Sequence, residues 1–332
     1  MSEKEWNPAK LLEVSGSYWK SCVLHAAVKL DIFSIIGDEQ LSSGDISKKL
    51  SADARGVATL LDALAAMNLL HKDGRKYANT PPSSSFLSRG SPNYIGHIIS
   101  HHHNLMASWA YLDRAVVSGR PIRARATEHD EQFRESFLMG MFNLAMMIAP
   151  RVVDCIDLSD RRHLLDLGGG PGTYAIHFCL NNSQLKATVY DLPTTKTFAR
   201  ETIERFGLSD RIDFSAGNYL EEGIRGTYDV AWLSHILHAE GPEDCERIIR
   251  KVVSALEAGG LIIVHDFILN DSMDGPLFPA LFSINMLLGT HSGRAYSERQ
   301  IMDMLSNAGV KEIQRSSFRG PNDSGIIQGI VK

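Results

Sequence analysis

Two different spacings of apolar residues divide the chain. Up to residue 157 the apolar positions recur mainly at intervals of three and four residues, the spacing of amphipathic helices. From His163 onward, short apolar runs that end in turn residues alternate with helical segments. This alternation predicts an α/β fold with a Rossmann-like, doubly wound and mostly parallel sheet, preceded by an α-helical region.

Residues 1–96 are expected to form a helical domain with one hairpin. The predicted elements are helices over 8–37, 41–50 and 54–70 and a hairpin over 71–77. The hairpin has Asp73 and Gly74 at its turn. Residues 80–96 are rich in Pro, Ser and Gly and are expected to form a loop. Helix, helix and hairpin together are the outline of a winged helix.

A winged helix would also suit a DNA-binding regulator, so the residues of its second helix decide between two functions. The segment 54–67 carries Arg55 and a few small polar side chains and is otherwise apolar. A recognition helix needs Arg, Lys, Asn or Gln directed at base edges and further cations for phosphates. The helix is therefore predicted to be covered by protein in a dimerisation module, with DNA binding as the less favoured alternative.

Residues 97–157 are expected to form a helical linker that lines a substrate pocket. Amphipathic helices are predicted from His97 to Val117 and from Glu131 to Asp157. The second is rich in Met and Phe, which fill ordinary cores and also line apolar pockets. With three residues from later in the chain, the candidate substrate-binding residues are His97, His101, Met106, Trp109, Phe137, Met141, Phe142, Phe282, Met286 and His291. Ordinary core packing explains any single one of them equally well.

Residues 158–332 are expected to form the ligand-binding domain. The apolar runs predict five strands, at residues 163–167, 187–191, 211–215, 228–234 and 261–266. The tail is expected to add two antiparallel edge strands over 310–317 and 325–331.

Composition and charge narrow the class of protein. The chain has 332 residues and a formal net charge of −5 at pH 7, which does not suit a nucleic-acid surface. Its four cysteines form no CxxC pair, so we expect reduced thiols in a cytoplasmic protein and no metal site. The polar N-terminus is unlike a secretory signal, and no uncharged apolar run is long enough to span a bilayer. Neither nucleic acid nor a membrane is an expected partner.

The segment after the first strand of the predicted sheet carries the strongest functional signal. An apolar run ends in Asp166, a glycine cluster follows, and a helix begins at Thr173. The spacing matches neither the dinucleotide fingerprint nor a phosphate loop, and the turn contains no Lys or Arg. An acidic glycine turn suits a ligand with a cationic head, such as S-adenosylmethionine, better than a pyrophosphate. A turn that only links strand to helix is the alternative.

Three further strand ends complete the candidate cofactor site. Asp191 ends the second strand, where a carboxylate can accept hydrogen bonds from ribose hydroxyls or cap a helix. Asn218 and Tyr219 follow the third strand, at the expected place of the adenine. The candidate residues for S-adenosylmethionine are Asp166, Gly168, Gly169, Gly170, Asp191, Leu192, Gly217, Asn218, Tyr219, Ser234 and His235.

His238 is the candidate catalytic base. It follows the fourth strand three residues after His235 and lies toward the expected substrate opening. Histidine is suited to proton removal near neutral pH. A pair of surface histidines or a metal pair are the alternatives, although no nearby Cys or carboxylate cluster completes a metal set. Asp266, at the end of the fifth strand, could hydrogen-bond the imidazole and fix its tautomer.

These motifs resemble the class of S-adenosylmethionine-dependent small-molecule O-methyltransferases that includes plant caffeic acid and flavonoid enzymes, acetylserotonin methyltransferase and bacterial polyketide-tailoring enzymes. The resemblance covers almost the full chain, including a helix motif from His101 to Leu112, the glycine turn, the Asp191-Leu-Pro segment and Ile-Leu-His238. It implies methyl transfer to a hydroxyl of a small aromatic acceptor, with S-adenosylhomocysteine as product. It also implies that His238 deprotonates the hydroxyl beside Asp266, and that a homodimer forms through the N-terminal domain.

The chain departs from the family pattern at two positions. Family members often read His-Asp-Trp where this chain has His238-Ala239-Glu240, and Ala295 stands near the place of a second flanking Glu of plant members. The base is then less rigidly held, or Glu240 takes part. The rival functions are a C- or N-methyltransferase on the same scaffold and a non-catalytic winged-helix regulator that binds S-adenosylmethionine, because fold alone does not fix activity.

Overall fold

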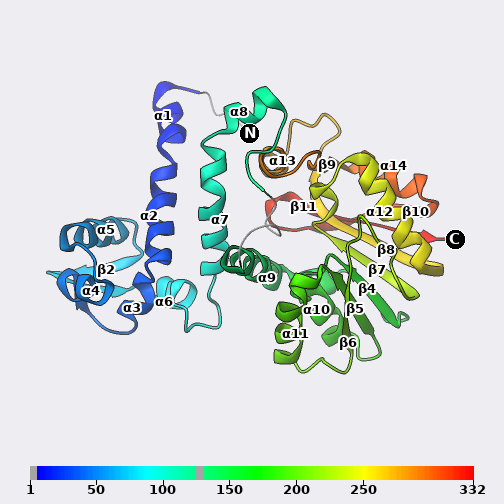
Figure 1. Ribbon diagram of the computed structural model, residues 1–332, viewed down its shortest axis with the longest axis horizontal. Coiled ribbons are helices and arrows are strands. Elements are labelled where there is room, and N and C mark those ends of the chain that lie inside the picture. Colours follow the sequence, from blue (N-terminus) through cyan, green and yellow to red (C-terminus); the bar gives the residue numbers. More distant parts are fainter. Residues whose placement is uncertain (1–5, 125–130) are drawn as a thin grey trace. The chain divides into compact units, whose positions relative to one another are not determined.

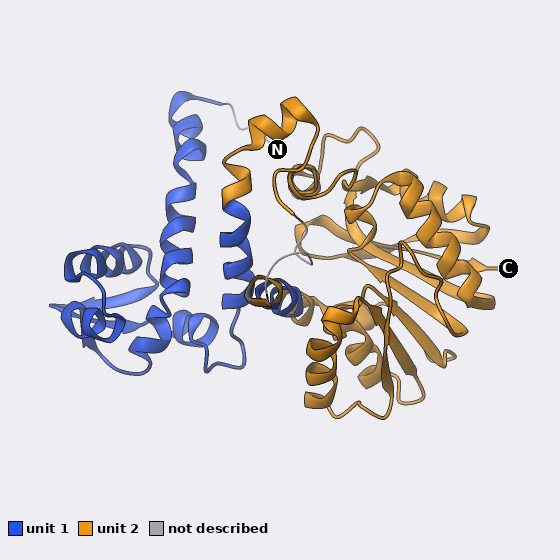
Figure 2. Cartoon of the chain, viewed as in Figure 1, with its two compact units in different colours: residues 1–106, 135–143 blue, residues 107–134, 144–332 orange. Residues whose placement is uncertain are grey.

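The computed structural model describes residues 6–124 and 131–332, and it divides into two compact units (Figure 2). Unit 1 comprises residues 1–106 and 135–143, and unit 2 comprises residues 107–134 and 144–332. Two long helices, α7 (Gly96–Trp109) and α9 (Glu131–Val153), contribute residues to both units.

Unit 1 consists of helices around a small antiparallel sheet with the strand order β1-β3-β2 (Figure 1). Its remaining elements are α1 (Pro8–Gly16), α2 (Tyr18–Lys29), α3 (Ile32–Ile36), β1 (Leu41–Ser42), α4 (Ser43–Leu50), α5 (Ala54–Ala66), β2 (Leu70–Asp73), β3 (Lys76–Asn79) and α6 (Pro81–Leu87). The predicted hairpin is confirmed, because Asp73 of β2 pairs with Lys76 of β3.

Helix caps and one apolar core define unit 1. Ser42 and Asp45 form a capping box at the start of α4, and the Asp53 carboxylate accepts a hydrogen bond from the Gly56 N–H at the start of α5. The fully buried apolar side chains come from α2, α3, α4 and α5 and include Phe33, Ile46, Leu61 and Leu64. Helix α1, in contrast, buries none of its own residues.

Three of the helix and loop predictions are wrong. The continuous helix expected at the start of the chain is divided into α1, α2 and α3, and Asp31 before α3 has φ of +56°. The stretch expected to be a loop contains α6, because a proline fits the first turn of a helix and the buried Ser83 hydroxyl donates to the Leu69 carbonyl at 2.6 Å. The helix expected from His97 to Val117 is interrupted after Trp109 and resumes as α8 (Leu112–Ser118). At the break, Tyr111 leaves the helical conformation and its N–H donates to the Ser108 carbonyl.

Unit 2 contains the predicted α/β sheet, with the strand order β10-β11-β8-β7-β4-β5-β6 (Figure 1). Its elements are β4 (His163–Leu167), α10 (Thr173–Asn181), β5 (Lys186–Asp191), η2 (Pro193–Thr195), α11 (Lys196–Arg205), β6 (Ile212–Ala216), β7 (Tyr228–Ser234), η3 (Leu237–Ala239), α12 (Pro242–Ala255), β8 (Leu256–Leu269), α13 (Leu277–Gly289), β9 (Tyr296–Ser297), α14 (Glu298–Asn307), β10 (Val310–Arg319), η4 (Pro321–Asp323) and β11 (Ser324–Val331). The strands from β4 to β8 pair in parallel, whereas β10 and β11 are antiparallel. Of the two tail strands only β10 lies at an edge, because β11 pairs with both β10 and β8.

Helices cover both faces of this sheet, so its central strands are apolar on both sides. One core joins the sheet to α10, α11 and the end of α9, and the other joins it to α12 and α14. Along β7, Trp232 belongs to the first core and Leu233 to the second. The mostly parallel, doubly wound sheet is therefore confirmed.

The order of the strands makes β4 the point at which the winding of the sheet changes direction. Strand β4 pairs with β5 on one side and with β7 on the other, so the chain reverses its direction of winding there. In open α/β sheets, ligands bind outside the carboxyl ends of the strands at such a switch point. The segments that leave β4 and β7 at this point begin at Gly168 and His235.

One segment, Phe133–Val153 of α9, is long and apolar enough by length and composition to cross a membrane. Its uncharged part covers residues 136–150 only. A single helix of this kind is weak evidence for a membrane span, because core helices of soluble proteins have the same length and composition.

Candidate functional site

The glycine turn is a tightly packed loop between β4 and α10. Gly168, Gly170 and Gly172 have φ of +63°, +54° and +80°, in the left-handed region that favours glycine. Gly169 is required for a different reason, since a Cβ there would lie 2.6 Å from the Cγ of Asp166. The backbone of the turn therefore lies directly against the Asp166 carboxylate.

Asp166 is a buried carboxylate without a cationic neighbour in the turn. It is 1% exposed, and its Oδ2 accepts a hydrogen bond from the Ala175 N–H at 3.2 Å. Burial, with a smaller contribution from the charge of Asp191, raises the pKa of Asp166 to about 7. A cationic group placed at this turn would favour the ionised carboxylate.

The Asp191 carboxylate at the end of β5 already accepts three hydrogen bonds from neighbouring segments. Its Oδ2 accepts from the Gly170 N–H at 2.8 Å, and its Oδ1 accepts from the Leu192 N–H at 2.7 Å and the Thr195 hydroxyl at 3.0 Å. Burial raises the pKa of Asp191 despite these bonds. A carboxylate offers about four acceptor sites, so Asp191 retains capacity for a further donor.

The segment after β6 lies beside the end of β5. The Gly217 N–H donates to the Asp191 carbonyl at 2.9 Å, and the Asn218 Oδ1 accepts from the Leu220 N–H at 3.0 Å. A Cβ at Gly217 would overlap the hydroxyl of Tyr190, which is buried and has no hydrogen-bond partner among the described residues. We did not single out Tyr190 from the sequence, although a tyrosine in an otherwise small and aliphatic strand was a signal for it.

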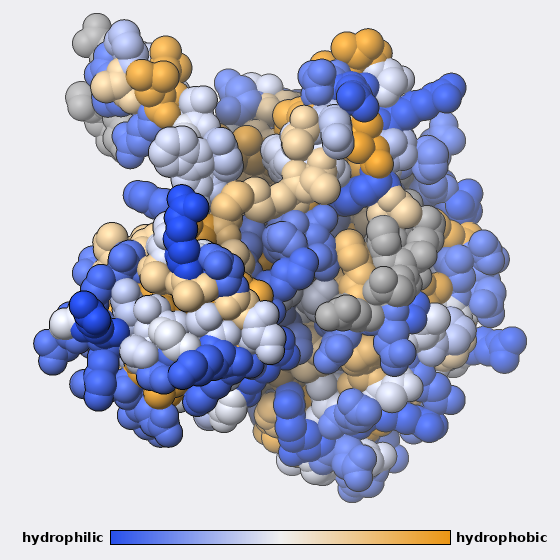
Figure 3. Space-filling model, turned by 60° about the vertical axis from the view of Figure 1, so that its left-hand side comes forward, coloured by the Kyte–Doolittle hydropathy of each residue, from blue (hydrophilic) through white to orange (hydrophobic). Residues whose placement is uncertain are grey.

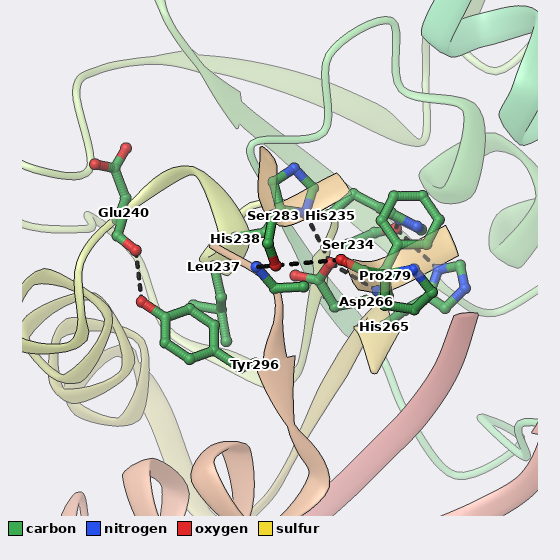
Figure 4. A network of polar contacts seen from close by, with 12 residues as sticks. Ser234, His235, Leu237, His238, Glu240, His265, Asp266, Pro279, Ser283 and Tyr296 are labelled. Atoms are coloured by element: carbon green, nitrogen blue, oxygen red, sulfur yellow. Dashed lines mark hydrogen bonds and ion pairs between the residues drawn. The ribbon is translucent and has the colours of Figure 1, made fainter. Parts of the chain in front are cut away.

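His238 and Asp266 meet across the ends of β7 and β8 (Figure 4). The Nδ1 atom of His238 lies 2.7 Å from the Oδ1 atom of Asp266, and the Phe267 N–H donates to the same oxygen at 2.8 Å. Burial alone would raise the pKa of Asp266, but the charge and hydrogen bond of His238 outweigh it and hold the pKa below its ordinary value. Because Nδ1 contacts Asp266, Nε2 is the ring nitrogen left for another partner.

Phenylalanine side chains surround the His238 imidazole. The ring of Phe282, from α13, lies 4.7 Å from the His238 ring at an interplanar angle of 75°. The ring of Phe267 stacks at 6.0 Å and 18°, and Phe278 packs against both phenylalanines. Phe267 and Phe278 were not predicted, because their role depends on how α13 packs on β8. The imidazole thus combines a carboxylate partner with apolar neighbours.

Ser234, at the end of β7, contacts two further histidines near His238 and Asp266. Its hydroxyl lies 2.9 Å from Nδ1 of His235 and 3.0 Å from Nδ1 of His265. Burial lowers the pKa of His235 to about 4, and burial also lowers that of His265 well below its ordinary value. Both rings are therefore neutral at physiological pH. His235 also has φ of +56°, which is rare for a residue other than glycine.

Glu240 and Ala295 lie close to the site without replacing the missing family residues. The Glu240 carboxylate accepts a hydrogen bond from the Tyr219 hydroxyl at 3.4 Å, and Figure 4 shows it directed away from Asp266. The Glu240 backbone carbonyl accepts from the Tyr296 hydroxyl at 2.6 Å. Ala295 is fully buried, and its N–H donates to the Ser283 hydroxyl at 3.1 Å.

The predicted substrate-binding residues are divided between the two units. In unit 2, Phe282 touches His238, Met286 is buried one turn further along α13, and Trp109 and His291 are exposed. In unit 1, the rings of His101 and Phe137 lie 5.2 Å apart. The predicted residues within unit 1 are His97, His101, Met106, Phe137, Met141 and Phe142.

Comparisons with known proteins show which family the chain resembles. The chain matches the family model of the O-methyltransferase domain over residues 109–311 and that of the O-methyltransferase dimerisation domain over residues 12–89. It is 29% identical to the 3-hydroxy-5-methyl-1-naphthoate 3-O-methyltransferase of Streptomyces sahachiroi, over 97% of this chain and 95% of that protein. It is also 27% identical to the N,N-dimethyltransferase OxyT of Streptomyces rimosus, over 77% of each chain.

A solved structure extends the similarity to the cofactor. The crystal structure of human N-acetylserotonin methyltransferase in complex with S-adenosylmethionine matches 99% of each chain, with a TM-score of 0.86 and 25% identity. The chain therefore belongs to the O-methyltransferase family, and it is an enzyme that uses S-adenosylmethionine as its methyl donor.

Proposed function

We propose that this enzyme transfers the methyl group of S-adenosylmethionine to a phenolic hydroxyl of a small aromatic acceptor, with His238 as the general base. The observation that carries the proposal is the 2.7 Å contact between His238 Nδ1 and Asp266 Oδ1, which joins the segment after β7 to its neighbouring strand β8. Asp266 fixes the tautomer of the imidazole and stabilises the imidazolium that forms. The carboxylate of Asp266 therefore makes Nε2 the proton acceptor.

Proton removal and bond exchange balance in a single step. His238 Nε2 takes the hydroxyl proton while the acceptor oxygen forms a bond to the methyl carbon. The bond between that carbon and sulfur breaks, and its electron pair stays on the sulfur of S-adenosylhomocysteine. When bound, S-adenosylmethionine supplies a methyl group on a positively charged sulfur. Alignment of the two reactants gives most of the acceleration, and the base adds about 10²–10⁴-fold.

The residues at the ends of β4, β5, β6 and β7 fit the methyl donor. The turn formed by Gly168, Gly169 and Gly170 exposes backbone without side chains, and Asp166 beneath it favours a cation. Asp191 accepts from a ribose hydroxyl through its remaining acceptor capacity. The other donor-binding residues in this proposal are Leu192, Gly217, Asn218, Tyr219, Ser234 and His235.

The acceptor is proposed to be aromatic because apolar rings surround the base. Phe267, Phe278 and Phe282 offer flat surfaces within contact distance of one another and of His238. The naphthoate methyltransferase acts on an aromatic compound by its name. Methylation of nitrogen, as in the name of OxyT, is the second candidate, and a neutral amine acceptor would need His238 less.

We further propose that residues 1–96 act as a winged-helix-like dimerisation domain. Large apolar side chains stay exposed on α1 and α2, including Leu12 at 73% and Trp19 at 68% exposure. Figure 3 shows apolar side chains gathered at the α1 end of unit 1. A homodimer would cover them, and the match to the dimerisation domain supports this partner. Sedimentation equilibrium of the full chain distinguishes a dimer from a monomer, and a monomer at all concentrations rejects the proposal.

The decisive experiment replaces the base. In His238→Asn we expect kcat to fall about 10²–10⁴-fold, while calorimetry finds unchanged affinity for S-adenosylhomocysteine. The control is His71→Asn, which changes an exposed histidine in β2. Full turnover of His238→Asn would remove His238 as the base. Product analysis with a labelled methyl donor shows whether the methyl group arrives on oxygen, nitrogen or carbon.

A further inference from the structure

We propose that Arg123 forms an anion subsite beside the catalytic histidine and binds a carboxylate of the acceptor, so that the acceptor is a hydroxylated aromatic acid. The inference rests on the proposed function, because it places this subsite in the same acceptor site as His238. It adds a specificity-determining residue that the comparisons do not assign, and the acceptor class that follows is the class in the name of the naphthoate methyltransferase.

The Arg123 guanidinium is held by neutral groups only. Its Nη1 donates to the Ser108 hydroxyl at 2.9 Å, and its Nη2 donates to the backbone carbonyl and the side-chain Oδ1 of Asn285, both at 3.0 Å. Among the described residues, no carboxylate forms an ion pair with it. A guanidinium has five N–H donors, so two of them remain for a ligand.

Removal from water without an acidic partner is costly for a cation. Burial lowers the pKa of Arg123 to about 10, and no acidic group raises it again. The chain also makes room for the guanidinium, because a Cβ at Gly289 would lie 2.7 Å from Arg123 Nη2. A positive charge kept half-buried in a fitted position, with neutral partners, is suited to an incoming anion.

Helix α13 connects this guanidinium to the catalytic histidine. Phe282, Asn285 and Gly289 recur at helical spacing and therefore share one face of α13. The first contacts the His238 ring, and the other two contact Arg123. One helical turn rises about 5.4 Å, so the imidazole and the guanidinium lie against neighbouring turns of the same face. An aromatic acid could therefore place its hydroxyl group at the His238 imidazole and its carboxylate at the Arg123 guanidinium.

A purely structural role does not require the charge of Arg123. The backbone N–H groups of Ile122 and Arg123 already donate to the Leu288 carbonyl at 2.9 and 3.1 Å, which fastens this segment to α13. A neutral side chain at position 123 would keep both of these bonds. The charge of the guanidinium can therefore serve to discriminate between acceptors with and without a carboxylate.

The test compares acids with their esters. Hydroxynaphthoic acids and their methyl esters are titrated into the full-length protein loaded with S-adenosylhomocysteine, and both are then assayed as acceptors. We expect the wild-type protein to prefer at least one acid over its ester. In Arg123→Gln, the Kd and KM for that acid should rise about 10–100-fold, since one charged hydrogen-bond partner is lost. The constants for the ester and for S-adenosylhomocysteine should stay within about twofold, a margin far below one charged bond.

Matched variants separate charge from folding. Arg120→Gln removes an exposed arginine nearby and should change nothing. Asn285→Asp keeps Arg123 but places a carboxylate against it, and should abolish the preference for the acid without removing the guanidinium. If Arg123→Gln weakens acid and ester equally, weakens S-adenosylhomocysteine, or if no acid binds better than its ester, the subsite does not exist. Those results would leave the His238 experiment unaffected, so the two proposals fail separately.

Discussion

The proposed donor end and the proposed acceptor end of the site are built in different ways, although both lie at the carboxyl ends of neighbouring strands. At the donor end, the geometry depends on main chain: glycines at positive φ, a close approach to Asp166, and N–H groups bonded to Asp191. At the acceptor end it depends on side chains from η3, β8 and α13, such as His238, Asp266 and Phe282. A cofactor shared by a whole family suits a fixed backbone cradle, whereas an acceptor that differs between enzymes suits exchangeable side chains.

Among changes at the donor end, the largest expected effect comes from crowding the glycine turn. In Gly169→Ala the new Cβ would lie 2.6 Å from Asp166 Cγ and 2.7 Å from its Oδ2, so the turn must shift. Overpacking of this kind costs about 1–3 kcal/mol, and we expect affinity for S-adenosylhomocysteine to fall about 10–100-fold. The KM for the acceptor, measured at saturating donor, should hardly change.

Gly223→Ala is the control for this variant, because nothing lies within 4 Å of its added Cβ. If Gly169→Ala raised the acceptor KM as strongly as the donor Kd, the two ends would not be separable as we describe them.

A smaller effect should appear when pH changes the charge of the donor end. Burial raises the pKa of Asp166 to about 7. In the proposed donor site, only the ionised carboxylate would attract the ammonium group of the donor. Affinity for S-adenosylhomocysteine should therefore rise roughly eightfold from about pH 6 to about pH 7.5, as the ionised fraction of Asp166 grows. Calorimetry across this range measures the slope.

Stability without ligand should change in the opposite direction. The pKa of Asp166 is higher in the folded protein than in the unfolded chain. Its contribution to the free energy of unfolding is therefore fully present below about pH 4 and is lost as pH rises to about 7. Asp166→Asn should flatten both profiles, and Asp154→Asn, at an exposed site, should flatten neither. An unchanged profile in Asp166→Asn would assign the pH dependence to another group.

The smallest expected effect concerns the acceptor capacity of Asp191. The Thr195 hydroxyl donates to Asp191 Oδ1 at 3.0 Å and competes with a ribose hydroxyl for that oxygen. Thr195→Val removes this donor, so affinity for S-adenosylhomocysteine should rise about 2–5-fold, the value of an ordinary hydrogen bond. Weaker binding in this variant, measured by calorimetry, would show that the Thr195 hydroxyl positions Asp191 instead of competing for it.

The same contrast explains how much could be predicted from the sequence. Asp166, Asp191, His238 and Asp266 were identified because each ends a strand or follows one closely, and parallel strands bring such ends together. The glycine turn is equally local, because spacing and backbone conformation both belong to one segment. The mostly parallel sheet follows from the alternation of strands and helices, whereas the order of its strands is known from the structure.

Other features depend on contacts between segments far apart in the chain. The position of the Arg123 guanidinium depends on Asn285, which is 162 positions away in the chain. The place of Phe278 in the site depends on its packing against Phe267. Helix α6 was taken for a loop because its serines are typical of loops, whereas Ser83 is buried against Leu69. Contacts of this kind between distant segments cannot be predicted from the spacing of apolar residues within one segment.

The winding of α7 and α9 through both units has a consequence for recombination. The chain crosses from one unit to the other after residues 106, 134 and 143, so no single cut frees either unit whole. Exchange of the N-terminal part between relatives at a junction before residue 135 would separate Phe137 and Met141 from the rest of unit 1, to which they belong. Hybrid enzymes of this family should therefore tolerate junctions that carry both helices together, and fail at junctions placed between them.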